Sequence, residues 1–312
     1  MANPVLLYAC SGVDPKPWID AFCLHMPELE VRQWPHLGDP ADIDYVLAWK
    51  QPPGLLQTLP NLKVIFSLGA GVEHVLSDHT LPPGIPLVRM VDPGLTIGMV
   101  EFVLLCVLRY HRRLPEHEAN QKARRWQALT PKLPQDQRVG IMGLGELGAA
   151  CAQSLVTLDF DVAGWSRTAK SLAGVMCFHG PEGLIPFLNR TDIVVCLLPL
   201  TADTDSILNA RTLAALPRGA YVINAARGRH VVEEDLLAAV DSGHIAGATL
   251  DVFRQEPLPP DHRFWSHPKV TVIPHSAALT QPKTAARTIA DNIRRHQSGQ
   301  PLLYVVDRAR GY

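Results

Sequence analysis

The sequence predicts an α/β protein with two doubly wound parallel sheets, each in its own domain. The chain has 312 residues, more than one hydrophobic core usually holds, so two domains are expected. Short apolar runs alternate with helical segments in the first hundred residues, and the same alternation restarts at Arg138. This alternation is typical of parallel sheets that carry helices on both faces.

Four apolar runs of the first half are expected to be strands. Turns rich in proline and glycine separate them, as at Gln51–Gly54 and Leu81–Gly84. The expected strands are Val5–Ala9, Tyr45–Trp49, Val64–Leu68 and Leu87–Met90. A long helix is expected from about Gly98 to Arg113, because its apolar residues recur at helical spacing.

Six further strands are expected in the second half, and with their helices they make a complete doubly wound unit. They are Val139–Met142, Val162–Trp165, Ile193–Leu198, Tyr221–Asn224, Gly247–Leu250 and Val270–Ile273. A helix from about Lys283 is expected to close the chain.

Composition excludes several classes of protein. Hydrophobic residues make up 47% and charged residues 19%, as in ordinary globular proteins. The net charge is −1 and no basic block occurs, so a nucleic-acid partner is not expected. The apolar run Val5–Ala9 is shorter than the roughly 7 to 15 residues of a signal peptide. No continuous apolar stretch approaches the roughly 18 residues of a membrane span. A cytoplasmic protein without membrane contact is expected.

The six cysteines are scattered, without a Cys-x-x-Cys pair, and are expected to be free thiols in a reducing compartment. No His-Glu-x-x-His or similar ligand spacing occurs, so no metal site is expected.

A glycine-rich turn follows the first strand of the second half. It has the Gly-x-Gly-x-x-Gly pattern and consists of Gly143, Leu144, Gly145, Glu146, Leu147 and Gly148. The first glycine permits a tight turn, the second lets the backbone approach a pyrophosphate, and the third allows close packing of the next helix. Since the turn lies between a strand and a helix, it predicts a dinucleotide site of the Rossmann type.

The end of the next strand indicates which dinucleotide binds. An NAD site usually carries an acidic residue there, which binds the ribose 2′-hydroxyl. This chain instead has Trp165, Ser166, Arg167 and Thr168, a cation and hydroxyl donors suited to a 2′-phosphate. NADP is therefore the favoured cofactor and NAD the alternative; a solvated loop arginine is the competing interpretation of Arg167.

Three loops that follow apolar stretches carry candidate catalytic residues: Arg227, Glu256 and His275. A 2-oxo acid dehydrogenase needs an arginine to bind a carboxylate with its planar fork of donors. It also needs a histidine that supplies a proton as hydride arrives, and a carboxylate that orients the histidine and favours its protonated form.

With these motifs the chain resembles the D-isomer-specific 2-hydroxyacid dehydrogenase family, and within it the glyoxylate/hydroxypyruvate reductase A branch. The resemblance covers nearly the whole chain. The matching segments are Leu68–Val72, Val100–Glu101, Gly143–Gly148, Leu198–Thr201, Ala226–Gly228, Leu250–Phe253, Glu256–Pro257 and Pro274–His275. Trp165–Thr168 and the C-terminal Val306–Tyr312 are similar to the branch in particular.

The resemblance implies a flavodoxin-like substrate domain of residues 1–98 with 284–312. It also implies an NAD(P)-binding Rossmann domain of residues 99–283, with a cleft between the two. The implied reaction is NADPH-dependent reduction of glyoxylate to glycolate and of hydroxypyruvate to D-glycerate. His275 would donate the proton, Glu256 would favour the charged imidazole, and Arg227 would bind the carboxylate and polarise the carbonyl oxygen.

Further site residues are implied on both domains. The implied cofactor contacts beyond the glycine turn and the Trp165–Thr168 segment are Leu198, Pro199, Leu200, Ala225, Ala226 and Asp251, of which Asp251 matches the position that holds the nicotinamide amide. The implied substrate contacts besides Arg227 and His275 are Trp49, Leu68, Gly69, Ala70 and Gly71. His230 and His267 match no family role and are expected to be bystanders.

Two alternatives stay open. One is another D-2-hydroxyacid dehydrogenase of the phosphoglycerate or lactate type, although no basic cluster marks a phosphate pocket in the substrate domain. The other is a non-catalytic NAD(P)-sensing binding protein on the same fold. The family usually forms dimers through the nucleotide domain, so a homodimer is expected, with the segment from Arg112 to Pro134 as a contributor.

Overall fold

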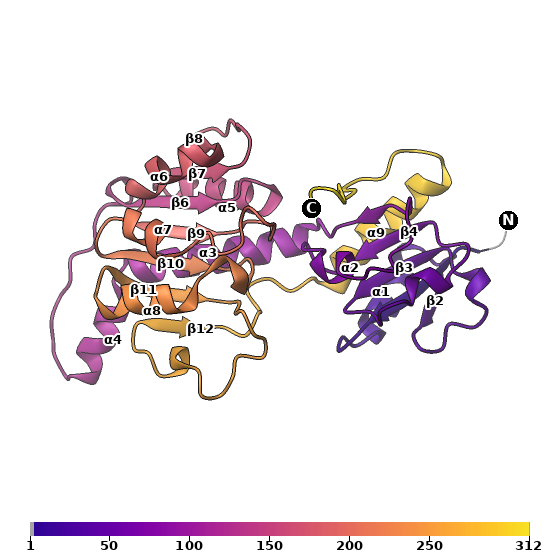
Figure 1. Ribbon diagram of the computed structural model, residues 1–312, viewed down its shortest axis with the longest axis horizontal. Coiled ribbons are helices and arrows are strands. Elements are labelled where there is room, and N and C mark those ends of the chain that lie inside the picture. Colours follow the sequence, from indigo (N-terminus) through magenta and orange to yellow (C-terminus); the bar gives the residue numbers. More distant parts are fainter. Residues whose placement is uncertain (1–2, 312) are drawn as a thin grey trace. The chain divides into compact units, whose positions relative to one another are not determined.

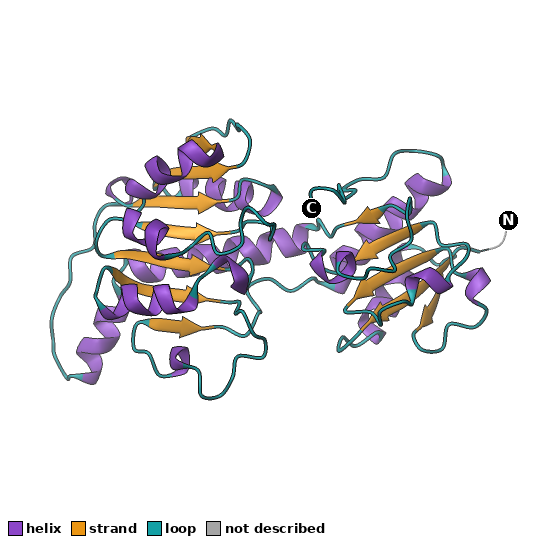
Figure 2. Ribbon diagram, in the orientation of Figure 1, coloured by secondary structure: helices purple, strands orange, loops and turns teal. Residues whose placement is uncertain are grey.

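The computed structural model describes residues 3–311. Met1, Ala2 and Tyr312, which belong to the expected first domain and the C-terminal motif, lie outside the described residues. The chain divides into two compact units, Met1–Leu95 with Leu279–Tyr312 (unit 1) and Thr96–Ala278 (unit 2). Figures 1 and 2 show that each unit is a sheet covered by helices.

Unit 1 contains a five-stranded parallel sheet in the order β2-β1-β3-β4-β5. Its strands are β1 (Val5–Cys10), β2 (Glu30–Gln33), β3 (Tyr45–Trp49), β4 (Val64–Ser67) and β5 (Leu87–Val88). Its helices are α1 (Lys16–His25), α2 (Glu73–Leu76) and α9 (Pro282–Gln297), and α1 packs against α9. This strand order is the flavodoxin-like one.

The sequence predicts four strands for unit 1, and the structure has a fifth, β2. β2 is an edge strand whose four side chains are all at least partly exposed, so it carries no apolar run. The opposite edge, β5, is covered by the C-terminal segment, in which Val306 N donates to Leu87 O at 2.8 Å. Pairing of this kind protects an edge strand from other chains.

Unit 2 contains a seven-stranded parallel sheet in the order β12-β11-β10-β9-β6-β7-β8. Its strands are β6 (Arg138–Met142), β7 (Asp161–Ser166), β8 (Val175–His179), β9 (Ile193–Cys196), β10 (Ala220–Asn224), β11 (Ile245–Leu250) and β12 (Val270–Val272). The helices are α3 (Pro93–His111, mostly in unit 2), α4 (Leu114–Lys122), α5 (Glu146–Thr157), α6 (Gly180–Asn189), α7 (Ala210–Ala215) and α8 (Glu233–Asp241).

The prediction of two doubly wound parallel sheets is confirmed. The second sheet has seven strands, one more than the six predicted. β8 is again an edge strand, and none of its side chains is fully buried. The strand order reverses between β6 and β9, which are hydrogen-bonded neighbours. In open α/β sheets such a switch point, at the carboxyl ends of the strands, is where ligands bind.

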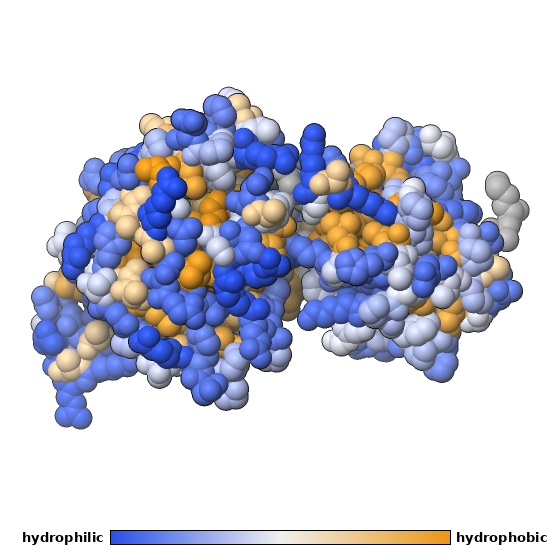
Figure 3. All heavy atoms as spheres, in the orientation of Figure 1, coloured by the Kyte–Doolittle hydropathy of each residue, from blue (hydrophilic) through white to orange (hydrophobic). Residues whose placement is uncertain are grey.

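Helix α3 is long and apolar enough, by length and composition, to cross a membrane, with a mean hydropathy of 1.5. One face of it is buried in the core of unit 2 through Met99, Val103, Val107 and Tyr110. The Tyr110 hydroxyl lies 2.6 Å from Thr249 Oγ1 in the sheet. These contacts explain the apolar residues of one face, whereas Ile97, Leu105 and Leu108 of the same helix are exposed. On the face drawn in Figure 3, apolar residues form small groups among hydrophilic ones.

Candidate active site

The glycine turn joins β6 to α5 at the switch point of unit 2. Gly143 has a φ of 102°, a region that favours glycine, and a Cβ there would lie 2.7 Å from Leu197 O. A Cβ at Gly148 would lie 1.7 Å from Gly143 O, so the third glycine allows the helix to begin directly against the turn. Both glycines are therefore required by the protein's own geometry.

Gly145 differs from these two, because a Cβ there would meet no protein atom within 4 Å. It is the N-cap of α5 and offers no side chain to the first N–H groups of that helix. A 12-residue helix with an uncovered N-terminus suits a phosphate group, because its N–H groups and dipole favour negative charge. The turn fits a dinucleotide pyrophosphate.

The residues expected to select the cofactor lie where β7 ends. Trp165 is buried, and its indole N–H donates to Gly180 O at 2.8 Å, so its ring belongs to the core. Ser166 Oγ donates to Thr168 O at 2.8 Å, which shapes the turn after the strand. Arg167 and Thr168 are exposed. A cation at this position suits the 2′-phosphate of NADP.

His275 and Glu256 form a pair. Nδ1 of His275 lies 2.8 Å from Oε2 of Glu256, and the other carboxylate oxygen accepts from Phe253 N at 3.0 Å. Both side chains are partly exposed, at 42% and 32%. The carboxylate thus fixes the imidazole through Nδ1, and Nε2 is the ring atom left for chemistry.

The loop of His275 is held by Asp251, a buried residue at the end of β11. Asp251 Oδ1 accepts from Ser276 N at 2.7 Å and from Ala277 N at 2.9 Å. Its backbone oxygen accepts from His275 N at 2.8 Å, and His275 has a φ of 51°, unusual for a residue other than glycine. Burial raises the pKa of Asp251, against the lowering effect of the two N–H donors.

Arg227 follows β10 in a loop that its neighbours hold rigidly. Asn224, which is buried, donates from Nδ2 to Arg227 O at 2.9 Å and accepts from Ala226 N at 3.2 Å. A Cβ at Gly228 would lie 1.9 Å from Phe253 C, so this loop packs directly on the backbone of the Glu256 loop. Neither residue was expected to have a role, although Gly228 belongs to the segment Ala226–Gly228 and Asn224 ends the expected strand before it.

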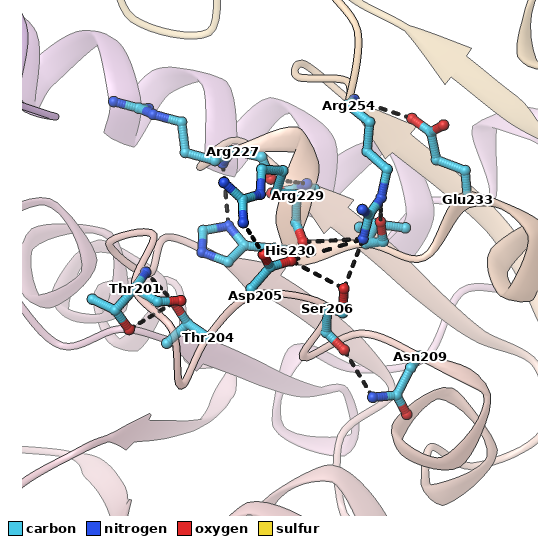
Figure 4. A network of polar contacts seen from close by, with 12 residues as sticks. Thr201, Thr204, Asp205, Ser206, Asn209, Arg227, Arg229, His230, Glu233 and Arg254 are labelled. Atoms are coloured by element: carbon cyan, nitrogen blue, oxygen red, sulfur yellow. Dashed lines mark hydrogen bonds and ion pairs between the residues drawn. The ribbon is translucent and has the colours of Figure 1, made fainter. Parts of the chain in front are cut away.

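A network of polar contacts surrounds this loop (Figure 4). Arg229 forms an ion pair with Asp205, and Arg254 donates from its guanidinium to Ser206 Oγ at 2.7 Å. The hydrogen bond from Arg229 lowers the pKa of Asp205, which burial alone would raise. The loops after β9, β10 and β11 are therefore linked to one another. His230, expected to be a bystander, lies within this network.

The expected substrate residues of unit 1 form their own cluster. A Cβ at Gly69 would lie 2.7 Å from Trp49 Cζ3, so the Trp49 ring packs on the Gly69–Gly71 loop. Ser67, for which the sequence predicts no role, donates from Oγ to Gly69 O at 2.9 Å. Leu68 is buried, and its carbonyl oxygen accepts from Thr280 Oγ1 at 2.8 Å.

The remaining expected cofactor residues line the ends of two strands of unit 2. Leu198 is buried and Pro199 and Leu200 are partly buried after β9, while Ala225 and Ala226 are buried after β10. Within residues 3–311, no group of three or more His, Cys, Asp or Glu side chains is placed to hold a metal ion.

A doubly wound sheet with a glycine turn after its first strand, and Arg, Glu and His on later loops at the same edge, defines a dinucleotide-dependent dehydrogenase. The family model "D-isomer specific 2-hydroxyacid dehydrogenase, NAD binding domain" matches residues 104–277. A glyoxylate/hydroxypyruvate reductase A from Yersinia enterocolitica is 43% identical over 302 residues, covering 95% of this chain and 96% of that protein.

Two crystal structures are also similar. A D-isomer specific 2-hydroxyacid dehydrogenase from Xanthobacter autotrophicus Py2, in complex with NADPH and MES, has a TM-score of 0.97, 46% identity and 100% coverage of both chains. An NADPH-dependent glyoxylate/hydroxypyruvate reductase from Sinorhizobium meliloti, in complex with NADP and sulfate, has a TM-score of 0.92 and 41% identity, covering 99% of this chain and 100% of that chain. The chain therefore belongs to the D-isomer specific 2-hydroxyacid dehydrogenase family, as its motifs predicted.

Proposed function

We propose that this chain is an NADPH-dependent reductase that converts glyoxylate to glycolate and hydroxypyruvate to D-glycerate. The observation that carries the proposal is the His275–Glu256 pair, 2.8 Å from Nδ1 to Oε2, on loops at the same sheet edge as Arg227 and the glycine turn. Relatives that match nearly its whole length are named glyoxylate/hydroxypyruvate reductase A, and similar structures hold NADPH or NADP.

His275 is the general acid in this proposal. NADPH, when bound, supplies the hydride for the C2 carbonyl carbon of the oxo acid. Nε2 of His275 donates a proton to the oxygen of that carbonyl, which becomes the hydroxyl group of the product. Glu256 keeps the ring oriented through Nδ1, so the proton is presented by one nitrogen only.

Arg227 binds the substrate carboxylate and polarises the carbonyl oxygen. A guanidinium presents five N–H donors in a planar fork, which matches a carboxylate in two-point binding. One donor, on Nη1, is directed to Ala226 O at 2.6 Å, and this contact fixes the side chain close to its own loop. A positive charge held in this way favours negative charge that develops on the carbonyl oxygen.

The substrate residues proposed in unit 1 contribute backbone donors. Gly69 N donates to Ser67 Oγ at 3.3 Å, whereas among the described residues the N–H groups of Ala70 and Gly71 have no acceptor. We assign these two N–H groups to the carboxylate of the oxo acid, with Trp49 and Leu68 beside them. Ser67 supports this role, because its hydroxyl group donates to the carbonyl oxygens of Gly69 and Gly71 and so holds the loop.

Cofactor binding is assigned to unit 2. The glycine turn receives the pyrophosphate, Arg167 with Ser166 and Thr168 receives the 2′-phosphate, and Leu198–Leu200 with Ala225–Ala226 flanks the cofactor. Asp251 Oδ1 is occupied by two backbone donors, so Oδ2 is the atom assigned to the nicotinamide amide. We accordingly assign residues 99–283 to the cofactor domain and residues 1–98 with 284–312 to the substrate domain.

The enzyme is further proposed to be a homodimer. The segment from Arg112 to Pro134 exposes Leu114, Trp126 and Leu133, apolar side chains that a second copy would cover. Sedimentation should give twice the mass of one chain, and Trp126→Ser should shift the equilibrium toward single chains. A wild-type protein that sediments as a single chain would contradict this assignment.

A cytoplasmic location is proposed as well. Cys106, Cys151 and Cys196 are free and buried, as is common in proteins of reducing compartments. Burial raises the pKa of each of these thiols to about 12, so they are unreactive. Fractionation of cells that produce the protein tests the location directly.

A turnover panel tests the proposed function. Glyoxylate, hydroxypyruvate, pyruvate and phenylpyruvate are each offered with NADPH and with NADH, and oxidation of the nicotinamide is followed by absorbance. The proposal requires the highest kcat/KM for glyoxylate or hydroxypyruvate with NADPH. A preference for pyruvate or phenylpyruvate would indicate another dehydrogenase of the family, and cofactor binding without turnover would indicate a sensing protein.

A further inference from the structure

We propose that His230 is a positioning residue for the reduction: its Nδ1 fixes the backbone N–H of Arg227, and its contact with Pro199 O keeps the ring proton on Nε2. This inference rests on the proposed function, because Arg227 is taken there to bind the oxo acid. His230 lies three residues after Arg227 and its side chain is fully buried. Its effect is exerted through Arg227, whose backbone N–H donates to it.

The two ring nitrogens of His230 contact two different loops. Nδ1 accepts from the backbone N–H of Arg227 at 3.2 Å. Nε2 lies 3.3 Å from Pro199 O, and since a carbonyl oxygen can only accept, Nε2 is the donor in this contact. One neutral tautomer, with its proton on Nε2, satisfies both contacts, whereas a doubly protonated ring could not accept from Arg227.

Both ends of this bridge are anchored independently. Pro199 O also accepts from Thr204 Oγ1 at 2.7 Å, so the carbonyl is held from two sides. Leu208 N donates to His230 O at 2.8 Å, and Ser206 N donates to Arg229 O at 2.8 Å. The imidazole therefore links two segments that other hydrogen bonds also hold, and Figure 4 shows its contact with Arg227.

The contact to Arg227 passes through its main chain, and in Figure 4 the guanidinium points away from the imidazole. His230 therefore acts on the main chain of Arg227 and makes this contact without using the guanidinium. Displacing a binding group by about 1 Å costs on the order of 10²-fold in rate. Loss of the acceptor at Nδ1 should therefore affect the oxo acid more than the cofactor.

Two replacements of His230 separate the contacts. His230→Asn keeps an oxygen near the position of Nδ1, which can accept from Arg227 N–H. His230→Gln reaches toward Pro199 but has no acceptor at the Nδ1 position. A matched control is His244→Asn, because His244 Nε2 lies 3.0 Å from Leu213 O in the same unit, away from the Arg227 loop.

Binding and kinetics are measured in parallel. Oxalate, a dicarboxylate that hydride cannot reduce, is titrated into the protein with NADPH bound, and NADPH alone is titrated by fluorescence. For His230→Gln we expect oxalate affinity and kcat/KM for glyoxylate to fall by about 10- to 100-fold, with NADPH affinity little changed. His230→Asn should restore most of both losses, and His244→Asn should match wild type.

Equal oxalate affinity in wild type and His230→Gln would overturn the inference, as would equal losses in the Asn and Gln variants. Circular dichroism establishes that each variant is folded. A variant that does not fold is replaced by His230→Ser, which lacks both ring nitrogens and should lose oxalate affinity like the Gln variant; wild-type affinity in it would overturn the inference. If wild type binds oxalate but reduces no 2-oxo acid, the proposed function fails, and the oxalate series still decides the role of His230.

Discussion

Replacement of Gly228 by alanine is the perturbation whose effect follows most directly from the structure. A Cβ at this position would lie 1.9 Å from Phe253 C, 2.0 Å from Phe253 O and 2.4 Å from Arg254 N. All three are backbone atoms, so rotation of a side chain cannot relieve the overlap. The loop that carries Arg227 and the loop that carries Glu256 would have to separate.

The size of that separation sets the expected loss. The Cβ falls about 1.5 Å short of the 3.4 Å at which ordinary contact begins. A misplacement of about 1 Å in a catalytic site can cost 10²-fold, so kcat/KM for glyoxylate should fall by about 10²-fold or more in Gly228→Ala. Overpacking of this kind also lowers the free energy of unfolding by about 1 to 3 kcal/mol.

The assay is steady-state oxidation of NADPH with glyoxylate, at a temperature where circular dichroism shows the variant to be folded. Gly183→Ala is the control, because a Cβ there would lie at an ordinary 3.4 Å from Phe178 Cβ, within helix α6. The control should keep wild-type kinetics. A folded Gly228→Ala enzyme with wild-type kcat/KM would refute the link between loop packing and catalysis.

Three further predictions concern single side chains. His275→Asn should lower turnover by about 10²-fold or more while NADPH binding persists, and normal turnover would remove His275 as the acid. Arg167→Ala should weaken NADPH binding by about 1.5 to 3 kcal/mol and leave NADH binding unchanged, which KM values for both cofactors measure. Equal losses for the two cofactors would mean that the arginine has a structural role. Burial raises the pKa of Asp192, but the hydrogen bonds from Arg138 and the charges of Lys132 and Arg138 together lower it, so the folded pKa lies below the ordinary value. The stability that this lowered pKa adds is present above the unfolded pKa of about 3.9 and is lost as pH falls. The free energy of unfolding in urea should therefore change less between about pH 5 and pH 2 in Asp192→Asn than in wild type. Identical pH dependence in the two proteins would contradict the prediction.

The interior strands could be predicted from sequence, whereas the edge strands could not. β9 has four fully buried residues and therefore appears in the sequence as an apolar run. β2 and β8 lie at sheet edges with side chains in solvent, so nothing in their composition separates them from loops. Their strand character comes from backbone hydrogen bonds to β1 and β7, which exist only after the sheet has formed.

The sequence by itself determined the glycine turn and singled out Arg227, Glu256 and His275 as candidate catalytic residues, because residue type and position after a strand indicate that chemistry. Only the tertiary structure decided what holds those residues in place. Glu256 and His275 are 19 residues apart in sequence but form a hydrogen bond, and His230 connects Arg227 to Pro199, 31 residues from the histidine. Supporting contacts of this kind join loops that become neighbours only when parallel strands bring their carboxyl ends to one edge, and no local pattern in the chain records that proximity.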